Sequence, residues 1–256
     1  MRVLALCGAA LLIACASDPD KSASPVDSAA PEVQDTADPT LRGAVQLAFP
    51  LADPDAFDQV VGHDHDPEDH SDEGAIGAAI CLDYLGRAFP YCYDGHEGSD
   101  FILAGSWAAM DAGSVEILAA ADGTVTETVD GYYDRCHADL GSGDVSCDGH
   151  EMKANRVTVE HVGDDGTVWR TRYLHMMTDS VAVEEGQSVR QGDVLGKVGS
   201  SGRSSFPHLH LELQQPMVDE AGEPAWDKLD PYAGPFSQEA TFWCAQGTED
   251  ELPGGC

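Results

Sequence analysis

Two histidines, His208 and His210, stand two positions apart in the segment PHLHLEL at 207–213. Together with Glu212 they alternate with three leucines, and this alternation is typical of a half-buried β-strand. On such a strand both imidazoles project from one face, with Cα atoms roughly 6.5–7 Å apart. At that spacing one imidazole could bind a metal while its neighbour reaches a group on that metal. Two surface histidines on an ordinary strand are the alternative.

Two earlier segments also concentrate histidine and acidic residues. The segment VGHDHDP at 61–67, with His70 just beyond, could bind a metal, but its proline and the acidic residues that follow favour an exposed acidic turn. In the second segment His96 and Asp100 stand four residues apart, the spacing of one helical face. Glycines on both sides of His96 oppose a helix. The sequence there predicts a turn that leads into a strand at 101–103.

The elements that would position these residues are predicted to be strands. The segment 114–129 predicts two strands around an Asp122-Gly123 turn. Two more strands are expected at 156–162 and 168–175, joined by a turn, and short strands punctuated by glycine follow between 181 and 199. Helix-like periodicity is scarce. We therefore expect an all-β fold built mostly of antiparallel sheets.

Composition limits the classes of partner. The chain has 256 residues with 42% apolar content, which is enough for a proper core. Its 13 basic and 46 acidic residues give a formal net charge of −33. Nucleic-acid phosphates would be repelled by such a surface, so no nucleic-acid partner is expected.

The N-terminal segment predicts export. Arg2 precedes an apolar run that is too short for a permanent membrane helix, and Leu12-Ile13-Ala14-Cys15 looks like a bacterial lipobox. We therefore expect a lipoprotein signal peptide at 1–15, with a lipid on Cys15 that anchors the protein to a membrane; a plain secretory signal is the alternative. Residues 16–44 are predicted to be a disordered acidic tether, because they hold few residues that could form a core. The residue after Cys15 is Ala16, and not the aspartate associated with inner-membrane retention. This favours the outer membrane or its periplasmic face.

Six cysteines remain after the predicted signal segment, and an even number in an exported chain indicates disulfides. Several pairings are possible from sequence, and a zinc–thiolate site is the competitor. No C-x-x-C pair is present, which disfavours that site. We favour pairing between sequence neighbours: Cys81–Cys92, Cys136–Cys147 and Cys244–Cys256.

Four motifs occur in order, and as a set they carry a family resemblance. They are GHEGSD at 95–100, YLH at 173–175, GSSGRSS at 199–205 and PHLH at 207–210. The chain over about 93–232 thereby resembles the lysostaphin-type (LytM-like) zinc endopeptidases. The resemblance implies a duplicated barrel-sandwich hybrid motif whose sheets form an open groove, with disulfide-bearing loop insertions. It implies a peptidase domain at 93–235, preceded by an extension at 45–92 that packs on the core and followed by a disulfide tail at 236–256.

The resemblance also assigns roles residue by residue. It makes His96, Asp100 and His210 the ligands of one zinc ion, and His175 and His208 the catalytic histidines. Two imidazoles and a carboxylate leave a fourth tetrahedral position for water, as a hydrolytic zinc site requires. Glu212, on the same strand face, is either an outer partner of an imidazole or an exposed acid. The sequence departs from the family pattern at Phe206, often glycine, and at Leu211, usually phenylalanine.

The function that the resemblance implies is hydrolysis of amide bonds in the peptide cross-links of bacterial peptidoglycan. The expected partners are peptidoglycan peptide stems and a membrane, and the protein is expected to be a monomer. The main alternative is a catalytically silent wall-binding regulator that activates another hydrolase. A sugar-phosphotransferase carrier domain with paired histidines is a weaker rival, because such carriers work in the cytosol. A purely structural surface lipoprotein would leave the ordered motifs unexplained.

Overall fold

A computed structural model describes residues 45–113, 115–139, 144–248 and 252–256, all within one unit of the chain, Thr36–Cys256. The predicted signal peptide at 1–15 and tether at 16–44 lie outside these described residues. In the described part of the chain, no helix has the length and apolar character needed to cross a bilayer.

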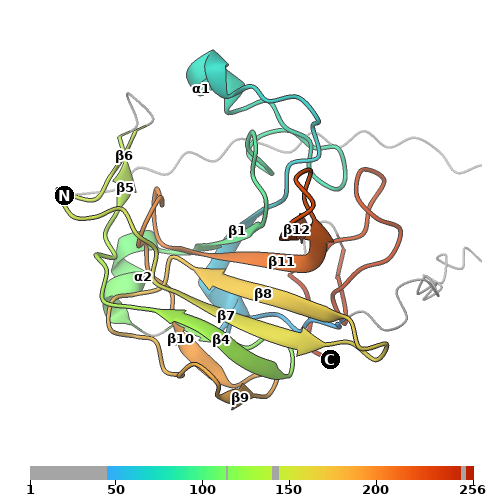
Figure 1. The fold of residues 1–256 in the computed structure, drawn as a ribbon. Coiled ribbons are helices and arrows are strands. Elements are labelled where there is room, and N and C mark those ends of the chain that lie inside the picture. Colours follow the sequence, from blue (N-terminus) through green and yellow to red (C-terminus); the bar gives the residue numbers. More distant parts are fainter. Residues whose placement is uncertain (1–44, 114, 140–143, 249–251) are drawn as a thin grey trace, which may run out of the picture. The chain divides into compact units, whose positions relative to one another are not determined.

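One large antiparallel sheet organises the described residues (Figure 1). His210 lies on its longest strand, β11, which runs between β2 and β8. The prediction of an all-β, mostly antiparallel fold is confirmed. In spatial order the strands are β1 (Phe57–Val61), β2 (Ser99–Leu103), β11 (His208–Val218), β8 (Val168–Leu174), β7 (Arg156–Val162), β4 (Gly123–Val129) and β9 (Ser188–Val189), and β12 (Pro224–Leu229) also pairs with β11.

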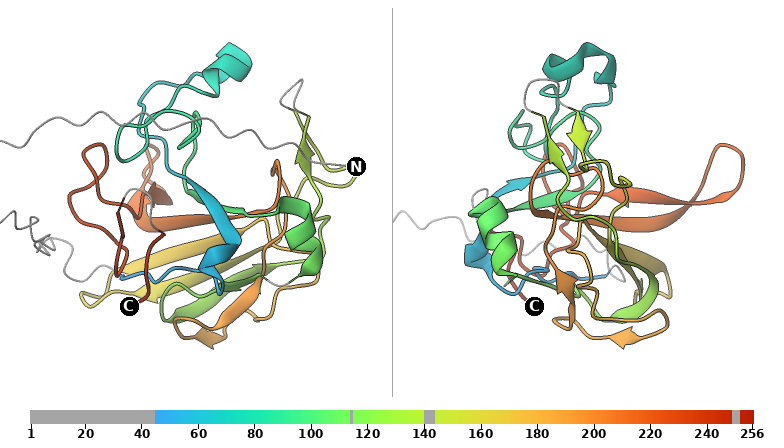
Figure 2. Two further views of the ribbon diagram at one scale, coloured as in Figure 1. Left: turned by 180° about the vertical axis from the view of Figure 1, so that it is seen from behind. Right: turned by 90° about the vertical axis from the view of Figure 1, so that its left-hand side faces the viewer.

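Smaller elements surround this sheet. The described residues include two further strand pairs, of which the β5–β6 pair is flanked by the Cys136–Cys147 disulfide. Figure 2 shows that the β11–β12 hairpin extends beyond the rest of the sheet. The bounds are β3 (Glu116–Leu118) with β10 (Val194–Lys197), β5 (His137–Ala138) with β6 (Val145–Ser146), the helices α1 (Gly74–Gly77) and α2 (Ser106–Ala112), and the 3-10 turns η2 (Pro54–Ala56) and η3 (Ser71–Glu73).

The two strands predicted around Asp122 and Gly123 are present, but they do not pair with each other. Instead, β3 pairs with β10, and β4 pairs with β7 and β9. The three alanines at 119–121 are buried in the core, so the chain passes between sheets here instead of reversing on itself. The carbonyl of Asp122 accepts a hydrogen bond from Nδ1 of His161, and its carboxylate accepts one from the backbone N–H of Gln191.

The core lies against one face of the large sheet. Leu209, Leu211 and Leu213 are fully buried there, beside Tyr173 of β8. The predicted strand at 207–213 is therefore confirmed, and it continues to Val218. Because side chains alternate across a strand, packing the leucines in the core turns His208, His210 and Glu212 to the opposite face.

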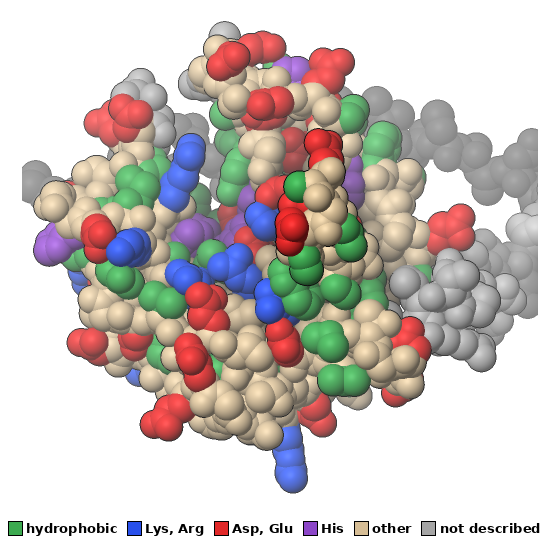
Figure 3. Space-filling view, viewed as in Figure 1, with side chains coloured by type: hydrophobic (Ala, Val, Ile, Leu, Met, Phe, Trp, Pro, Cys, Tyr) green, Lys and Arg blue, Asp and Glu red, His purple; other side chains and the backbone are tan. Residues whose placement is uncertain are grey.

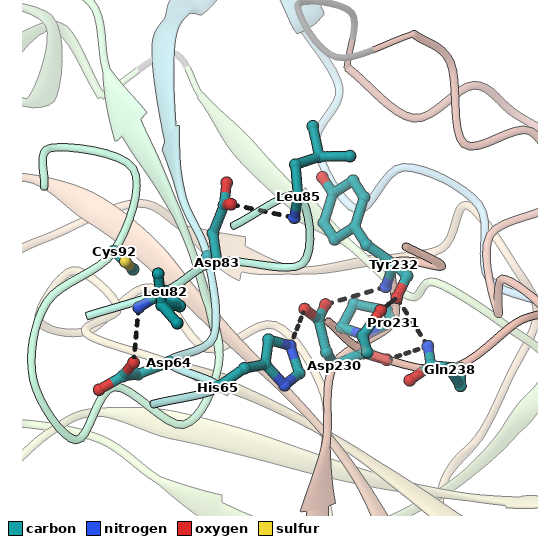
Figure 4. A network of polar contacts seen from close by, with 12 residues as sticks. Asp64, His65, Leu82, Asp83, Leu85, Cys92, Asp230, Pro231, Tyr232 and Gln238 are labelled. Carbon is teal, nitrogen blue, oxygen red and sulfur yellow. Dashed lines mark hydrogen bonds and ion pairs between the residues drawn. The ribbon is translucent and has the colours of Figure 1, made fainter. Parts of the chain in front are cut away.

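The segment 45–92 packs against the end of the chain. Leu47 is buried and forms an isolated bridge with Trp243. His65 contacts Asp230 through Nε2 and Oδ2, 2.9 Å apart (Figure 4). Asp64 accepts hydrogen bonds from the backbone N–H groups of Leu82 and Gly95. The exposed turn predicted here is thus limited to the residues at 67–69, since Asp64 and His65 are half-buried.

All three predicted disulfides are present: Cys81–Cys92, Cys136–Cys147 and Cys244–Cys256. Each closes a short local loop. Asp64 and the first cysteine pair bring ligand-type atoms close together, but disulfide sulfurs are not thiolates and do not form a zinc–thiolate site.

Candidate metal centre

Adjacent strands bring the central residues of the site together. His210 of β11 stands directly opposite Asp100 of β2, and His208 stands opposite Ile102. His96 lies in the turn before β2, which Asp64 braces through the N–H of Gly95. His175 directly follows β8 with a φ of 63°, a left-handed conformation that ends the strand.

His96, Asp100 and His210 form a cluster of three ligand-type groups. Nδ1 of His210 lies 2.7 Å from Oδ1 of Asp100. Nε2 of His96 lies 3.2 Å from that oxygen and 3.2 Å from Nδ1 of His210. Two imidazole nitrogens and one carboxylate oxygen that converge in this way suit zinc. The cluster joins the three residues that the sequence predicted as metal ligands.

Outer contacts orient the two imidazoles of this cluster. Nδ1–H of His96 donates to the carbonyl of Gly62 over 2.6 Å, so Nε2 keeps its lone pair. Nε2 of His210 faces Oε1 of Glu212 at 3.6 Å, and Nδ1 points to the cluster. Gly98 permits this packing, because a Cβ there would meet the imidazole of His210 at 2.5 Å.

His175 and His208 lie beside the cluster. Their ring centroids are 4.7 Å apart, and the ring of His175 lies 5.8 Å from that of His210. Nδ1–H of His175 donates to the carbonyl of Ser201 over 2.6 Å, and Nδ1–H of His208 donates to that of Phe206 over 2.7 Å. In the neutral tautomer each therefore leaves Nε2 unprotonated. Nε2 of His208 lies 3.5 Å from Oδ1 of Asp100.

The pKa shifts distinguish the groups that can accept a proton from the group that is charged at neutral pH. Burial, reinforced by His208 and His210, lowers the pKa of His175 to about 3, and burial likewise lowers the pKa of His208. Burial opposes ionisation of Asp100, but His96, His208 and His210 hold the pKa of its carboxyl well below the usual value. The site at neutral pH therefore combines an anionic carboxylate with two neutral imidazoles that can accept a proton.

Glu212 is a buried outer partner of His210, and the exposed alternative is wrong. Its carboxylate lies 2.7 Å from Nη1 of Arg172 and 3.5 Å from Nζ of Lys228. Burial would raise its pKa, but His210, Arg172 and Lys228 lower it to about 2. The alternation of 208, 210 and 212 on one strand face was the sequence signal for this contact.

The wall next to His208 belongs to the loop at 199–206. Oγ of Ser200 donates to the carbonyl of Cys136 over 2.7 Å, so the disulfide-bearing insertion is fastened to this loop. Phe206 also lines a cavity of about 600 Å³, together with Ser106, Trp107, Tyr133, Arg135, His137, Ala138, Asp148 and Ser205.

The sequence did not predict the role of Tyr93, whose ring stacks on His96 with centroids 4.2 Å apart. No motif pointed to this contact, because it depends on the fold of the turn before β2.

On the face shown in Figure 3, histidine side chains lie in a hollow with Lys and Arg side chains around it. Of the five predicted site residues, His210 is half-buried and the other four are buried.

A model of peptidase family M23 matches residues 95–224. Peptidoglycan DD-endopeptidase ShyB of Vibrio cholerae is 38% identical over 64 residues, which are 25% of this chain and 14% of that protein. The cell division protein DipM of Caulobacter vibrioides is 34% identical over 85 residues, 32% of this chain and 13% of that protein. The chain thus spans about a seventh of these relatives.

Solved structures give weaker matches. The catalytic domain of lysostaphin from Staphylococcus simulans is 22% identical with a TM-score of 0.33, covering 54% of this chain and 77% of that one. A zinc-containing peptidase from Vibrio cholerae is 20% identical with a TM-score of 0.39, covering 71% of this chain and 39% of that one. The match to the family model covers just over half of the present chain.

Proposed function

The chain belongs to peptidase family M23, and from this premise we propose that it is a zinc-dependent endopeptidase acting on the peptide cross-links of bacterial peptidoglycan. The convergence of His96, Asp100 and His210, with two further histidines beside them, is the observation that carries the proposal. The matching segments of peptidoglycan DD-endopeptidases ShyA and ShyB support the choice of substrate.

His96, Asp100 and His210 would hold the zinc ion, through Nε2, a carboxylate oxygen and Nδ1 respectively. Their donor set fits zinc, and their outer contacts to Gly62 and Glu212 fix which nitrogen is presented. When bound, zinc would polarise the scissile carbonyl and lower the pKa of a water molecule towards about 7.

His208 and His175 would manage the protons. Neutral His208 accepts a proton at Nε2 from the attacking water, because its Nδ1–H is committed to the carbonyl of Phe206. His175, held in the same tautomer by Ser201, lies beside it and can receive that proton at its own Nε2. A protonated histidine then returns the proton to the leaving amine.

The protein would act outside the cytoplasm, anchored by a lipid on Cys15. Three disulfides in the described residues support an oxidising compartment. We retain the division into an extension at 45–92, a peptidase domain at 93–235 and a tail at 236–256, and a monomeric state, as parts of this proposal.

Mass spectrometry of purified cell walls after incubation with zinc-loaded protein tests the function. We expect new peptide ends that are absent when the metal has been removed with a chelator. Intact cross-links despite bound zinc would contradict the proposal and favour the wall-binding regulator.

A further inference from the structure

Arg203 differs from most cations in the described residues because it has no acidic partner there. The cations on β7, β8 and β12 of the large sheet are neutralised: Arg156 pairs with Glu127, Arg170 with Glu160, and Arg172 and Lys228 with Glu212. In the described part of the chain, the cationic side chains without an ion pair are those of Arg190, Lys197 and Arg203. In a protein with a net charge of −33, a free cation at the site is unusual.

Arg203 lies in the loop between two residues that each contact one of the proposed catalytic histidines. Two residues before it, the carbonyl of Ser201 accepts from His175. One residue after it, Oγ of Ser204 lies 2.7 Å from Oγ of Ser200 and 3.3 Å from Nδ1 of His208. The Arg203 side chain itself is exposed, whereas Ser201 and Ser204 are buried.

Gly202 allows this loop to pack closely against the chain at 154–155. Its φ is +77°, and a Cβ there would lie 2.8 Å from the backbone nitrogen of Ala154. The backbone that carries Arg203 is therefore packed against the chain at 154–155, where the N–H of Asn155 also donates to Oγ of Ser201. A rigid base reduces the entropy lost when the arginine binds a ligand.

We propose that Arg203 binds a carboxylate of the substrate peptide next to the scissile bond. This inference rests on the proposed function. A guanidinium can hold a carboxylate through two parallel hydrogen bonds, and an unpaired one need not first give up an internal partner. Arg203 would thereby favour peptides with a free carboxylate over peptides in which that group is a carboxamide.

The test compares two substrates and three variants. The substrates are soluble cross-linked muropeptides with free carboxylates and the same muropeptides after conversion of their carboxylates to carboxamides. The variants are Arg203→Gln, Arg203→Lys and, as the matched control, Arg190→Gln, which removes an exposed unpaired cation next to β9. Zinc content is measured for each protein, and kcat and KM are measured for each substrate.

We expect the unchanged protein to prefer the carboxylate substrate by about five- to thirtyfold in kcat/KM, mainly through KM. Arg203→Gln should lose this preference and keep its zinc, Arg203→Lys should keep part of it, and Arg190→Gln all of it. Equal cleavage of both substrates by the unchanged protein, or an unchanged preference in Arg203→Gln, would overturn the inference and leave the proposed function standing. Cleavage of neither substrate by the zinc-loaded unchanged protein would overturn both.

Discussion

The histidines of the site differ in the ring nitrogen that each one presents. Backbone carbonyls of Gly62, Ser201 and Phe206 accept Nδ1–H from His96, His175 and His208, so these three present Nε2. His210 is turned the other way, with Nδ1 towards Asp100 and Nε2 towards Glu212. The motifs predicted which histidines meet, but the tautomers depend on carbonyls from two separate segments, at Gly62 and in the loop at 199–206, and could not be predicted from sequence.

Removing one metal ligand should remove the metal. His210→Ala deletes a donor atom and leaves Asp100 without its 2.7 Å contact. We expect zinc affinity to fall by about 100-fold or more, measured by calorimetric titration and by metal content after dialysis. His150→Ala, which removes an exposed histidine stacked on Tyr133, is the control and should bind zinc normally. Zinc retained at full affinity by His210→Ala would exclude this residue as a ligand.

Removing the proposed base should separate metal binding from turnover. His208 is not part of the three-ligand cluster, so His208→Ala should keep one zinc ion per chain. Its loss as a proton acceptor should lower kcat by about 10²- to 10⁴-fold. Metal content and kcat are measured on the same preparation, and full activity of this variant would show that the proton is handled elsewhere.

At the scale of elements, strands with strict alternation or clear turns were predictable. The strand at 207–213 and the β7–β8 hairpin were both confirmed. Strand β12 was not predicted, because it begins with Pro224 and carries Asp227 and Lys228, which are poor strand signals. It exists because β11 continues past the core and supplies a pairing edge. The pairing of β3 and β4 with other strands has the same origin, since tertiary contacts decided which strands pair.

A buried histidine in the sheet should make stability depend on pH. His161 of β7 is 1% exposed, and burial lowers its pKa. Between the lowered folded-state pKa and about 6.5, the unfolded chain binds a proton that the folded chain does not, so this contribution to stability falls as the pH falls. The free energy of unfolding of the unchanged protein should therefore exceed that of His161→Gln by less at pH 5 than at pH 7.5.

Urea unfolding at the two pH values measures this difference, with a limiting slope of about 1.4 kcal/mol per pH unit for one proton. His150→Gln, at an exposed position, is the control and should show no comparable change. An advantage over His161→Gln that is the same at both pH values would contradict the assignment of a neutral His161.

At the scale of the whole molecule, segments outside the four motifs hold and orient parts of the site. The Cys136–Cys147 insertion holds the loop at 199–206, and the segment 45–92 supplies the carbonyl of Gly62 that orients His96. Neither contact follows from the family motifs, because each joins a motif to a segment that the motifs do not include. The site therefore depends on parts of the chain outside the four motifs.

The central claim is that catalysis depends on a single zinc ion held by His96, Asp100 and His210. Zinc added stepwise to metal-free protein, with release of new peptide ends from cross-linked muropeptides followed at each step, tests it most directly. The account predicts that activity rises in proportion to bound zinc and reaches its maximum at one ion per chain. Full activity without metal, or no activity with one zinc ion bound, would contradict it.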